Sequence, residues 1–237
     1  DAIRHNSATS DAITTAADGT CTAKLTSIGG GGLSHRNLII NGAMNVSQRG
    51  TSSTVDGYGC IDRFRSNISG NDEAPTQSQV DVASGTSPYS LGFRKAFRMT
   101  NGNQTSGLGA GDYMYMNQTI EAQNIANSGW NYTSTSSYIT LSFWVKTNKT
   151  GTYSVAIDKN DSTRYRLPIT YTVSSADTWE KKVITIPGDT NSTADSVYNR
   201  GSATSLRGLV LYFDLGSGSN SEKSAANDWT ATATWGY

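Results

Sequence analysis

Hydrophobic and polar residues alternate along most of the chain, as they do in strands that bury one face. The clearest case is residues 139–145, where Ile, Leu, Phe and Val occupy every second position. A turn at residues 147–151 follows, and residues 153–157 then alternate in the same way. This pattern predicts a hairpin of two half-buried strands. Strict alternation places Trp144 opposite Phe143, so we expect its ring outside, or beneath a second layer or a partner subunit.

Further segments with the same alternation are separated by clusters of Gly, Ser, Asn and Asp. No stretch of a dozen residues repeats hydrophobic positions with a helical period, and we expect one helical turn at most, near residues 121–127. Many strands joined by turns predict an all-β fold, a jelly-roll-like antiparallel β-sandwich. The further expected strands are residues 91–99, 113–120, 164–173, 179–186, 206–215 and 229–235.

The N-terminal part differs from the rest in its composition. Asp18-Gly19 favours a tight hairpin turn between the short Thr/Ala stretches of residues 12–25, and four consecutive glycines begin at Gly29. We therefore expect three parts: an N-terminal β segment (1–28), a Gly-rich linker (29–36) and a β-sandwich domain (37–237).

The chain's ends and its longest loops add two expectations. The chain lacks an initiating Met and stops inside an expected strand, so we expect it to be a piece of a longer protein. Residues 101–112 and 188–205 form long loops, where a binding protein would carry its function.

Charge argues against two classes of partner. Lys plus Arg and Asp plus Glu number 19 each, so the net charge is zero and no basic field is present to attract DNA or anionic lipid. No apolar run approaches the roughly 20 residues that cross a bilayer. We expect neither nucleic-acid binding nor membrane insertion.

Nucleophilic catalysis has little support in the sequence. A Ser–His–Asp or Cys–His arrangement needs a histidine, and His5 and His35 lie in the leader and the linker. Cys21 and Cys60 are too few for a disulfide framework and have no C-x-x-C spacing. Whether these two cysteines pair is left open.

A glycosidase needs only two carboxylates that face each other across a sugar, and they can come from any two strands. Each candidate here has neighbours that suit an ordinary solvated carboxylate, and Glu180 precedes two lysines with which it can form an ion pair. We therefore expect that the chain is not an enzyme. The candidate acids are Asp112, Glu121, Glu180 and Asp214.

Phosphate and metal motifs are incomplete. Gly107, Gly109 and Gly111 precede an expected strand instead of a helix, so they predict a flexible turn. Two segments, starting at Asp158 and Asp189, carry oxygen at alternate positions, but neither has the glycine nor the closing glutamate of an EF-hand loop. We expect no cofactor, and calcium in another geometry stays an alternative.

Aromatic residues are the class best suited to recognition. The chain has 12 Tyr and 5 Trp, whose rings can stack on the C–H faces of sugars. One group lies in or beside a loop-rich region and is the candidate glycan-binding site, with a filled sandwich core as the alternative reading. Its members are Tyr113, Tyr115, Trp130 and Tyr132.

Three stretches are more specific than composition. They are Asn37-Leu-Ile-Ile-Asn-Gly-Ala-Met-Asn-Val-Ser-Gln-Arg-Gly-Thr51 leading to Cys60-Ile-Asp-Arg-Phe64, residues 139–153, and residues 178–190. Together they resemble virion proteins of tailed bacteriophages, especially marine ones. The resemblance implies that the first stretch opens a jelly-roll domain similar to carbohydrate-binding modules. The leader also resembles the short β-rich segment that precedes such domains.

The resemblance implies a non-enzymatic structural protein of the phage particle, most simply a tail fibre or adhesin that attaches to a host-surface glycan. Residues 1–28 would then contact other virion proteins or join subunits, and a homotrimer is expected by analogy with fibres. The alternatives are a capsid decoration protein or head fibre, a glycan-degrading enzyme, and a cellular carbohydrate-binding module.

Overall fold

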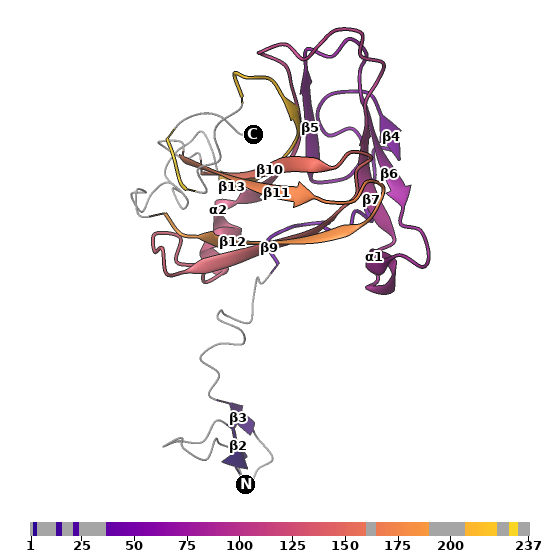
Figure 1. Ribbon diagram of the computed structural model, residues 1–237. Helices are drawn as coiled ribbons and strands as arrows, with labels where there is room; N and C mark the ends of the chain where they lie inside the picture. The colour runs from indigo at the N-terminus through magenta and orange to yellow at the C-terminus, as the bar shows by residue number, and fades with distance from the viewer. Residues whose placement is uncertain are drawn as a thin grey trace.

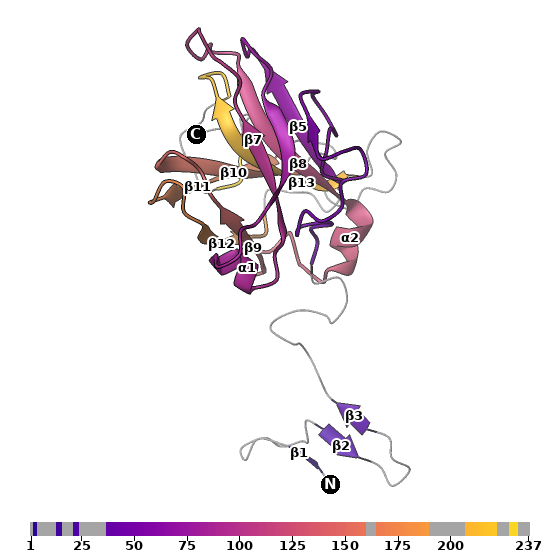
Figure 2. The same cartoon turned by 90° about the vertical axis from the view of Figure 1, so that its right-hand side faces the viewer.

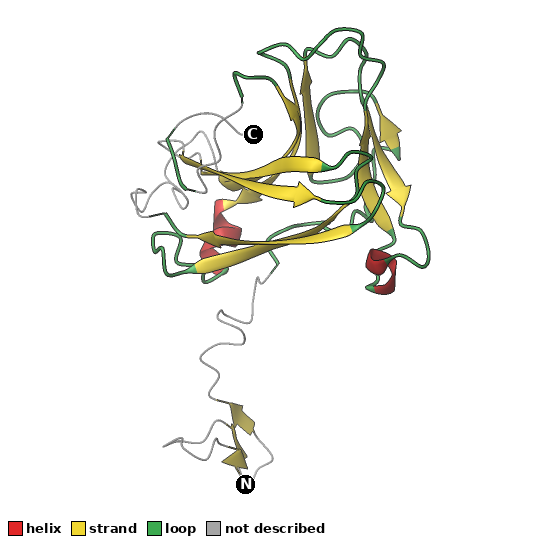
Figure 3. Cartoon of the chain, in the orientation of Figure 1, coloured by secondary structure: helices red, strands yellow, loops and turns green. Residues whose placement is uncertain are grey.

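The computed structural model describes residues 37–159, 165–189, 207–221 and 228–231, together with three short N-terminal strands. The expected all-β class is confirmed: the described residues form strands, loops and two short helices, and the sheets pack as an antiparallel sandwich (Figure 3). None of the helices in these residues is long and apolar enough to cross a membrane.

One layer is a five-stranded antiparallel sheet with the order β11-β10-β13-β8-β5. A pair of strands, β9 and β12, lies across from β10 and β11, and a three-stranded sheet β4-β6-β7 lies beside them (Figure 1). The bounds are β4 Ser52–Ser53, β5 Phe64–Ser69, β6 Thr76–Asp81, β7 Lys95–Thr100, β8 Tyr113–Glu121, β9 Tyr138–Val145, β10 Gly151–Lys159, β11 Tyr165–Val173, β12 Glu180–Pro187 and β13 Arg207–Ser217.

The main core fills the space between the two layers. Ile157, Leu167 and Leu211 of the five-stranded sheet are buried in the same cluster as Ile186 of β12. The ring of Phe143 on β9 crosses to the other layer, where it meets Tyr171 and Phe213 edge to face, each at 5.1 Å between centroids. Alternation along the strands thus aligns one face of each layer with the core.

The expected hairpin between residues 139–145 and 153–157 is wrong, although both strands exist. β9 pairs with β12, whereas β10 pairs with β11 and β13. The connection at residues 146–150 therefore crosses from one layer to the other. Alternation specifies which face of a strand is buried, but two strands that each bury one face can lie in the same sheet or in opposite layers.

Trp144 lies on the outer face of β9, opposite Lys181 of β12, and its side chain is half-buried. Tyr138, at the other end of β9, lies on the same face and is 57% exposed. This position agrees with the alternation of the strand.

The expected helical turn near residues 121–127 is present as α2 (Ala122–Asn127), at the lower end of β8 and β13 in Figure 2. The strand expected at residues 91–99 begins only at Lys95, because α1 (Ser87–Ser90) and a turn occupy the preceding residues. Of the strand expected at residues 229–235, the described part pairs Thr230 with Arg166.

The N-terminal strands are β1 (Ala2–Ile3), β2 (Ile13–Thr15) and β3 (Cys21–Ala23). β2 and β3 pair antiparallel, which confirms the expected hairpin, and β1 adds a third strand. Residues 29–36 lie outside the described residues, so the division into domains stays a prediction. Cys60 is a free, buried cysteine.

Candidate functional site

The outward face of the five-stranded sheet is polar and aromatic. Because the even-numbered residues of β8 and the odd-numbered residues of β13 point into the core, their neighbours gather on the opposite side. Register places Asp214, Tyr115 and Asn67 side by side on three adjacent strands. We call this side of the sheet the tyrosine face. Its half-buried members are Tyr113 and Tyr115, and its buried members are Asn67, Ser154, Tyr212 and Asp214.

Three tyrosine rings contact each other on this face. Tyr113 and Tyr115 stack with centroids 5.5 Å apart, and Tyr212 meets the ring of Tyr115 edge to face at 5.2 Å. Tyr212 is buried, whereas Tyr113 and Tyr115 are half-buried. Burial, and then the neighbouring Tyr212 and Tyr113, raise the pKa of Tyr115 to about 12. Its hydroxyl group therefore stays protonated at physiological pH.

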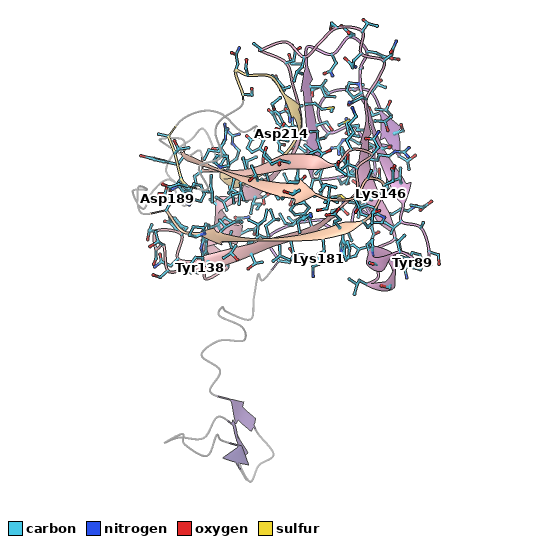
Figure 4. All side chains as sticks on the ribbon, viewed as in Figure 1. Tyr89, Tyr138, Lys146, Lys181, Asp189 and Asp214 are labelled. Atoms are coloured by element: carbon cyan, nitrogen blue, oxygen red, sulfur yellow. The ribbon has the colours of Figure 1, made fainter. Side chains whose placement is uncertain are left out.

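Asp214 is the carboxylate of the tyrosine face (Figure 4). Its oxygens accept hydrogen bonds from the hydroxyls of Ser217 at 2.7 Å and Ser154 at 3.3 Å, and from the backbone N–H of Gly216 at 3.2 Å. An irregularity in the pairing with β8 falls between Asp214 and Gly216, where the strand bends. Local donors thus hold this buried carboxylate in place beside Tyr115.

Two of the other candidate acids have their own partners. Glu121, at the far end of β8, forms an ion pair with Arg63. Glu180 accepts from the backbone of Ser174 and from Lys182. Asp112, just before β8, accepts from the backbone of Gly109, and nine strand residues place it roughly 30 Å from Glu121. Asp112 therefore lies at the same end of β8 as Tyr113, at the opposite end from Glu121.

The four candidate aromatic residues divide into two sets. Tyr113 and Tyr115 lie together on the tyrosine face. Trp130 and Tyr132 are each only 5% exposed and belong to the main core, where the indole N–H of Trp130 donates to the carbonyl of Ser137. Trp130 and Tyr132 therefore fill the core, as the alternative interpretation expected. Only Tyr113 and Tyr115 remain in the candidate site.

A pocket of about 210 Å³ lies where β5 ends and β8 begins, and Tyr113 is part of its wall. We call it the end pocket. Its other walls come from residues 69–71, the loop at residues 101–112 and the end of β13. This loop was expected to carry function from its length, and the structure places it beside the tyrosine face.

Asp72 anchors the loop that forms the end pocket. Its carboxylate accepts from the backbone N–H groups of Thr105 and Ser106, each at 2.7 Å, and from both of their hydroxyls. These hydrogen bonds, led by the Ser106 N–H, lower the pKa of Asp72 to about 2. The carboxylate is therefore charged at neutral pH, and its hydrogen bonds keep the loop in place.

Metal sites are absent from the described residues, in which no three His, Cys, Asp or Glu side chains come together. Asp158 forms an ion pair with Arg166 at 2.7 Å, and Asp189 forms one with Lys159. The remaining oxygen-bearing positions of the two alternating segments lie outside the described residues. Calcium in another geometry stays an untested alternative.

Sequence reasoning missed Tyr212, Asn67 and Asn71. The first could have been found, because alternation in the expected strand 206–215 places Tyr212 on the same face as Asp214. Asn67 lies in β5, whose sequence Phe-Arg-Ser-Asn-Ile-Ser has no clear alternation of hydrophobic and polar residues. Asn71 enters the end pocket only because a turn brings residues 69–71 against the loop at 101–112.

Comparisons with known proteins give one structural similarity. No family model matches the sequence, and no curated protein matches it. The chain is similar to the crystal structure of the enzymatically active domain of tailspike protein 4 from bacteriophage CBA120, with 15% identity and a TM-score of 0.41. The similarity covers 75% of this chain and 19% of the tailspike chain, so this chain spans about a fifth of that protein.

One expectation from the sequence is corrected by this comparison. The chain was expected not to be an enzyme, but the tailspike domain to which it is similar is an enzymatically active one. That contradicts the expectation, which is dropped. At this level of similarity the comparison concerns the fold, and the role in a phage particle is taken up as a proposal.

Proposed function

We propose that the chain is a module of a phage tail protein and that it attaches to a host-surface glycan through the tyrosine face. The phage-type segments at residues 37–51 and 60–64 support the first part, as does the β-sandwich. The second part is supported by the chemistry of the tyrosine face. Repeated copies on a particle would let weak sugar contacts add up through effective concentration.

The stacked pair Tyr113 and Tyr115 is the observation that carries the proposal. Sugars present apolar C–H faces and a rim of hydroxyls, which need flat aromatic rings next to hydrogen-bonding groups. The half-buried pair supplies the rings, and the buried Asn67 and Asp214 lie in register with Tyr115 and place an amide and a carboxylate beside them. Because strands position these groups, the site is largely formed before binding.

Binding to an array of bacterial capsule and lipopolysaccharide oligosaccharides tests the proposal. Tyr113→Ala and Tyr115→Ala, alone and combined, should lower the affinity for the bound glycans at least about tenfold. This change corresponds to roughly 1.4 kcal/mol of binding free energy. Tyr138→Ala is the matched control, because Tyr138 is an exposed tyrosine on the outer face of β9. Equal loss in Tyr138→Ala, or no loss in the double variant, contradicts the proposal.

Tyr115→Phe separates binding from folding in this experiment. It keeps the ring stack and removes only the hydroxyl, so the fold is retained and the affinity should fall less than in Tyr115→Ala. Thermal unfolding of each variant identifies any loss of binding that is due to loss of structure.

The same glycans decide whether attachment is accompanied by degradation. Each bound oligosaccharide is incubated with the chain, and new reducing ends are measured. Release that stops in Asp214→Asn assigns degradation to the tyrosine face, because Asp214 is the carboxylate beside the ring pair. Binding without release leaves attachment alone as the activity.

The place on the particle is tested by a reconstruction of the intact virion. We propose that the module lies on the tail as a trimer, with residues 1–28 contacting other virion proteins. Density for the chain on the capsid lattice contradicts the tail assignment and favours a capsid decoration protein.

A further inference from the structure

The end pocket has the size and the position to hold one unit of a glycan that lies on the tyrosine face. Its volume of about 210 Å³ accommodates a single sugar ring and little more. Tyr113 belongs both to the pocket wall and to the stacked pair, so the pocket and the tyrosine face are continuous.

The lining of the end pocket combines polar and apolar side chains and carries no positive charge. Asn71, Gln104 and Ser106 contribute amides and a hydroxyl, and Asp112 contributes the carboxylate. None of the lining residues in the described part of the chain is Lys, Arg or His. An anionic ligand would meet a carboxylate with no cation to offset its desolvation, whereas a neutral polyol finds hydrogen-bonding groups.

Asn71 has a hydrogen-bonding capacity that the protein does not use. Its side-chain oxygen is buried and has no hydrogen-bond partner among the residues that the structure describes. A buried acceptor without a donor costs free energy, and native structures rarely keep one without a reason. A sugar hydroxyl in the pocket would supply the donor after a small rotation of the amide.

Two glycines allow the walls of the end pocket to pack closely. Gly70 has a φ of +79°, and a Cβ there would lie 1.8 Å from a carboxylate oxygen of Asp112. A Cβ at Gly218 would lie 2.0 Å from the carbonyl oxygen of Gly109. The loop at residues 101–112 can therefore lie against the ends of β5 and β13 only because both positions lack a side chain.

We propose that the end pocket binds one neutral sugar unit of the glycan and discriminates against uronic acids. The inference rests on the proposed function, whose glycan would extend from the pocket over Tyr113 and Tyr115. Leu108, which is 62% exposed and lines the pocket, offers an apolar contact to the C–H groups of the sugar.

Titration of the ¹⁵N-labelled chain with matched sugars tests the inference. The probes are glucose with glucuronic acid and galactose with galacturonic acid, each at up to about 50 mM at pH 7, where weak binding is still detected. The neutral sugars should shift the amide signals of Asn71, Gly107 and Asp112, and each uronic acid should bind at least about tenfold more weakly. Equal or tighter binding of the uronic acids, or no shift with any neutral sugar, overturns the inference.

Two variants locate the effect. Asn71→Ala should remove the shifts, while Asn148→Ala, in an exposed turn, should not. Asp112→Asn keeps an oxygen that can accept from the Gly109 N–H, so it should retain the neutral sugars and bind uronic acids more tightly than the unchanged chain does. An unchanged preference in Asp112→Asn contradicts the assigned role of the carboxylate.

The two proposals fail separately. If glycan binding on the array depends on Tyr113 and Tyr115 but the sugar pairs show no preference, only the end-pocket inference is wrong. If the double tyrosine variant binds every glycan as the unchanged chain does, the proposed function itself is wrong.

Discussion

Asn41 shows, at the scale of one residue, how the segments at residues 37–51 and 60–64 are joined. Its backbone has a φ of 58°, in the left-handed region that Asn tolerates better than most residues. The side-chain amide donates to the carbonyls of Val46 at 2.9 Å and Asp62 at 3.0 Å, and its oxygen accepts from the Val46 N–H at 3.0 Å. One side chain therefore ties the segment at residues 37–51 to the segment at residues 60–64.

Asn41→Ala should lower the free energy of unfolding by about 2 kcal/mol, because it removes three hydrogen bonds to the backbone of Val46 and Asp62 and places Ala at a positive φ. Chemical denaturation measures the change. Asn37→Ala is the control, since Asn37 makes one exposed hydrogen bond to the N–H of Ile39. Equal losses in the two variants would show that the Asn41 contacts do not stabilise the fold.

At the scale of an element, the loop at residues 101–112 depends on a charge outside it. Asp72 precedes β6 in the chain and lies exposed, yet its carboxylate accepts hydrogen bonds from four donors of Thr105 and Ser106, two backbone N–H groups and two hydroxyls. The pKa of Asp72, about 2, lies below its ordinary value near 3.8. A lowered pKa means that the charged form is favoured in the folded state, so its stabilisation is complete above about pH 4 and is lost as the pH falls toward 2.

The loop at residues 101–112 should therefore lose its hydrogen bonds to Asp72 only at strongly acidic pH. The amide signals of Thr105 and Ser106, followed by NMR from pH 6 downward, should move with a midpoint of about 2. In Asp72→Ala these signals should differ from those of the unchanged chain already at pH 6 and show no such titration. A midpoint near 4 would mean that the hydrogen bonds from the loop do not lower the pKa of Asp72.

At the scale of the whole molecule, a buried ion pair connects the two layers. Lys159 ends β10 in the five-stranded sheet, and Asp189 follows β12 in the opposite layer. Their side chains are 0% and 1% exposed. The ammonium group also lies 4.8 Å from the ring of Trp229 and 5.1 Å from that of Tyr165. The pair thus fixes how the layers meet at this end of the sandwich.

Asp189→Asn should destabilise the fold by about 3 kcal/mol or more, because it leaves the buried charge of Lys159 without its counter-charge. Asp81→Asn is the control: Asp81 pairs with Lys95 at the surface and is 81% exposed, so the change should be small. Thermal and denaturant unfolding of both variants measure the difference. Similar stabilities would show that the interlayer pair is not needed.

The candidate site was only partly predictable, and the reason lies in its residues. Tyr113 and Tyr115 are two positions apart in a strand with clear alternation, so their common face follows from the sequence. Trp130 and Tyr132 have the same spacing, yet they lie in the core because they follow α2 in a loop that folds back over it. Side-chain chemistry is the same in both pairs, and only packing distinguishes them.

The sequence by itself determined much of the local structure: the strands from β7 to β13, their buried faces, the N-terminal hairpin and the short helix at α2. These follow from alternation and turn chemistry, which act over a few residues. It did not predict β4, β5 and β6. Three features were decided only by the tertiary structure. β9 pairs with β12 and not with β10, Asp214 lies beside Tyr115, and Asn71 lines a pocket together with the loop at residues 101–112. Pairing between distant strands depends on how all the buried faces fit into one core, and no short window of sequence contains that information.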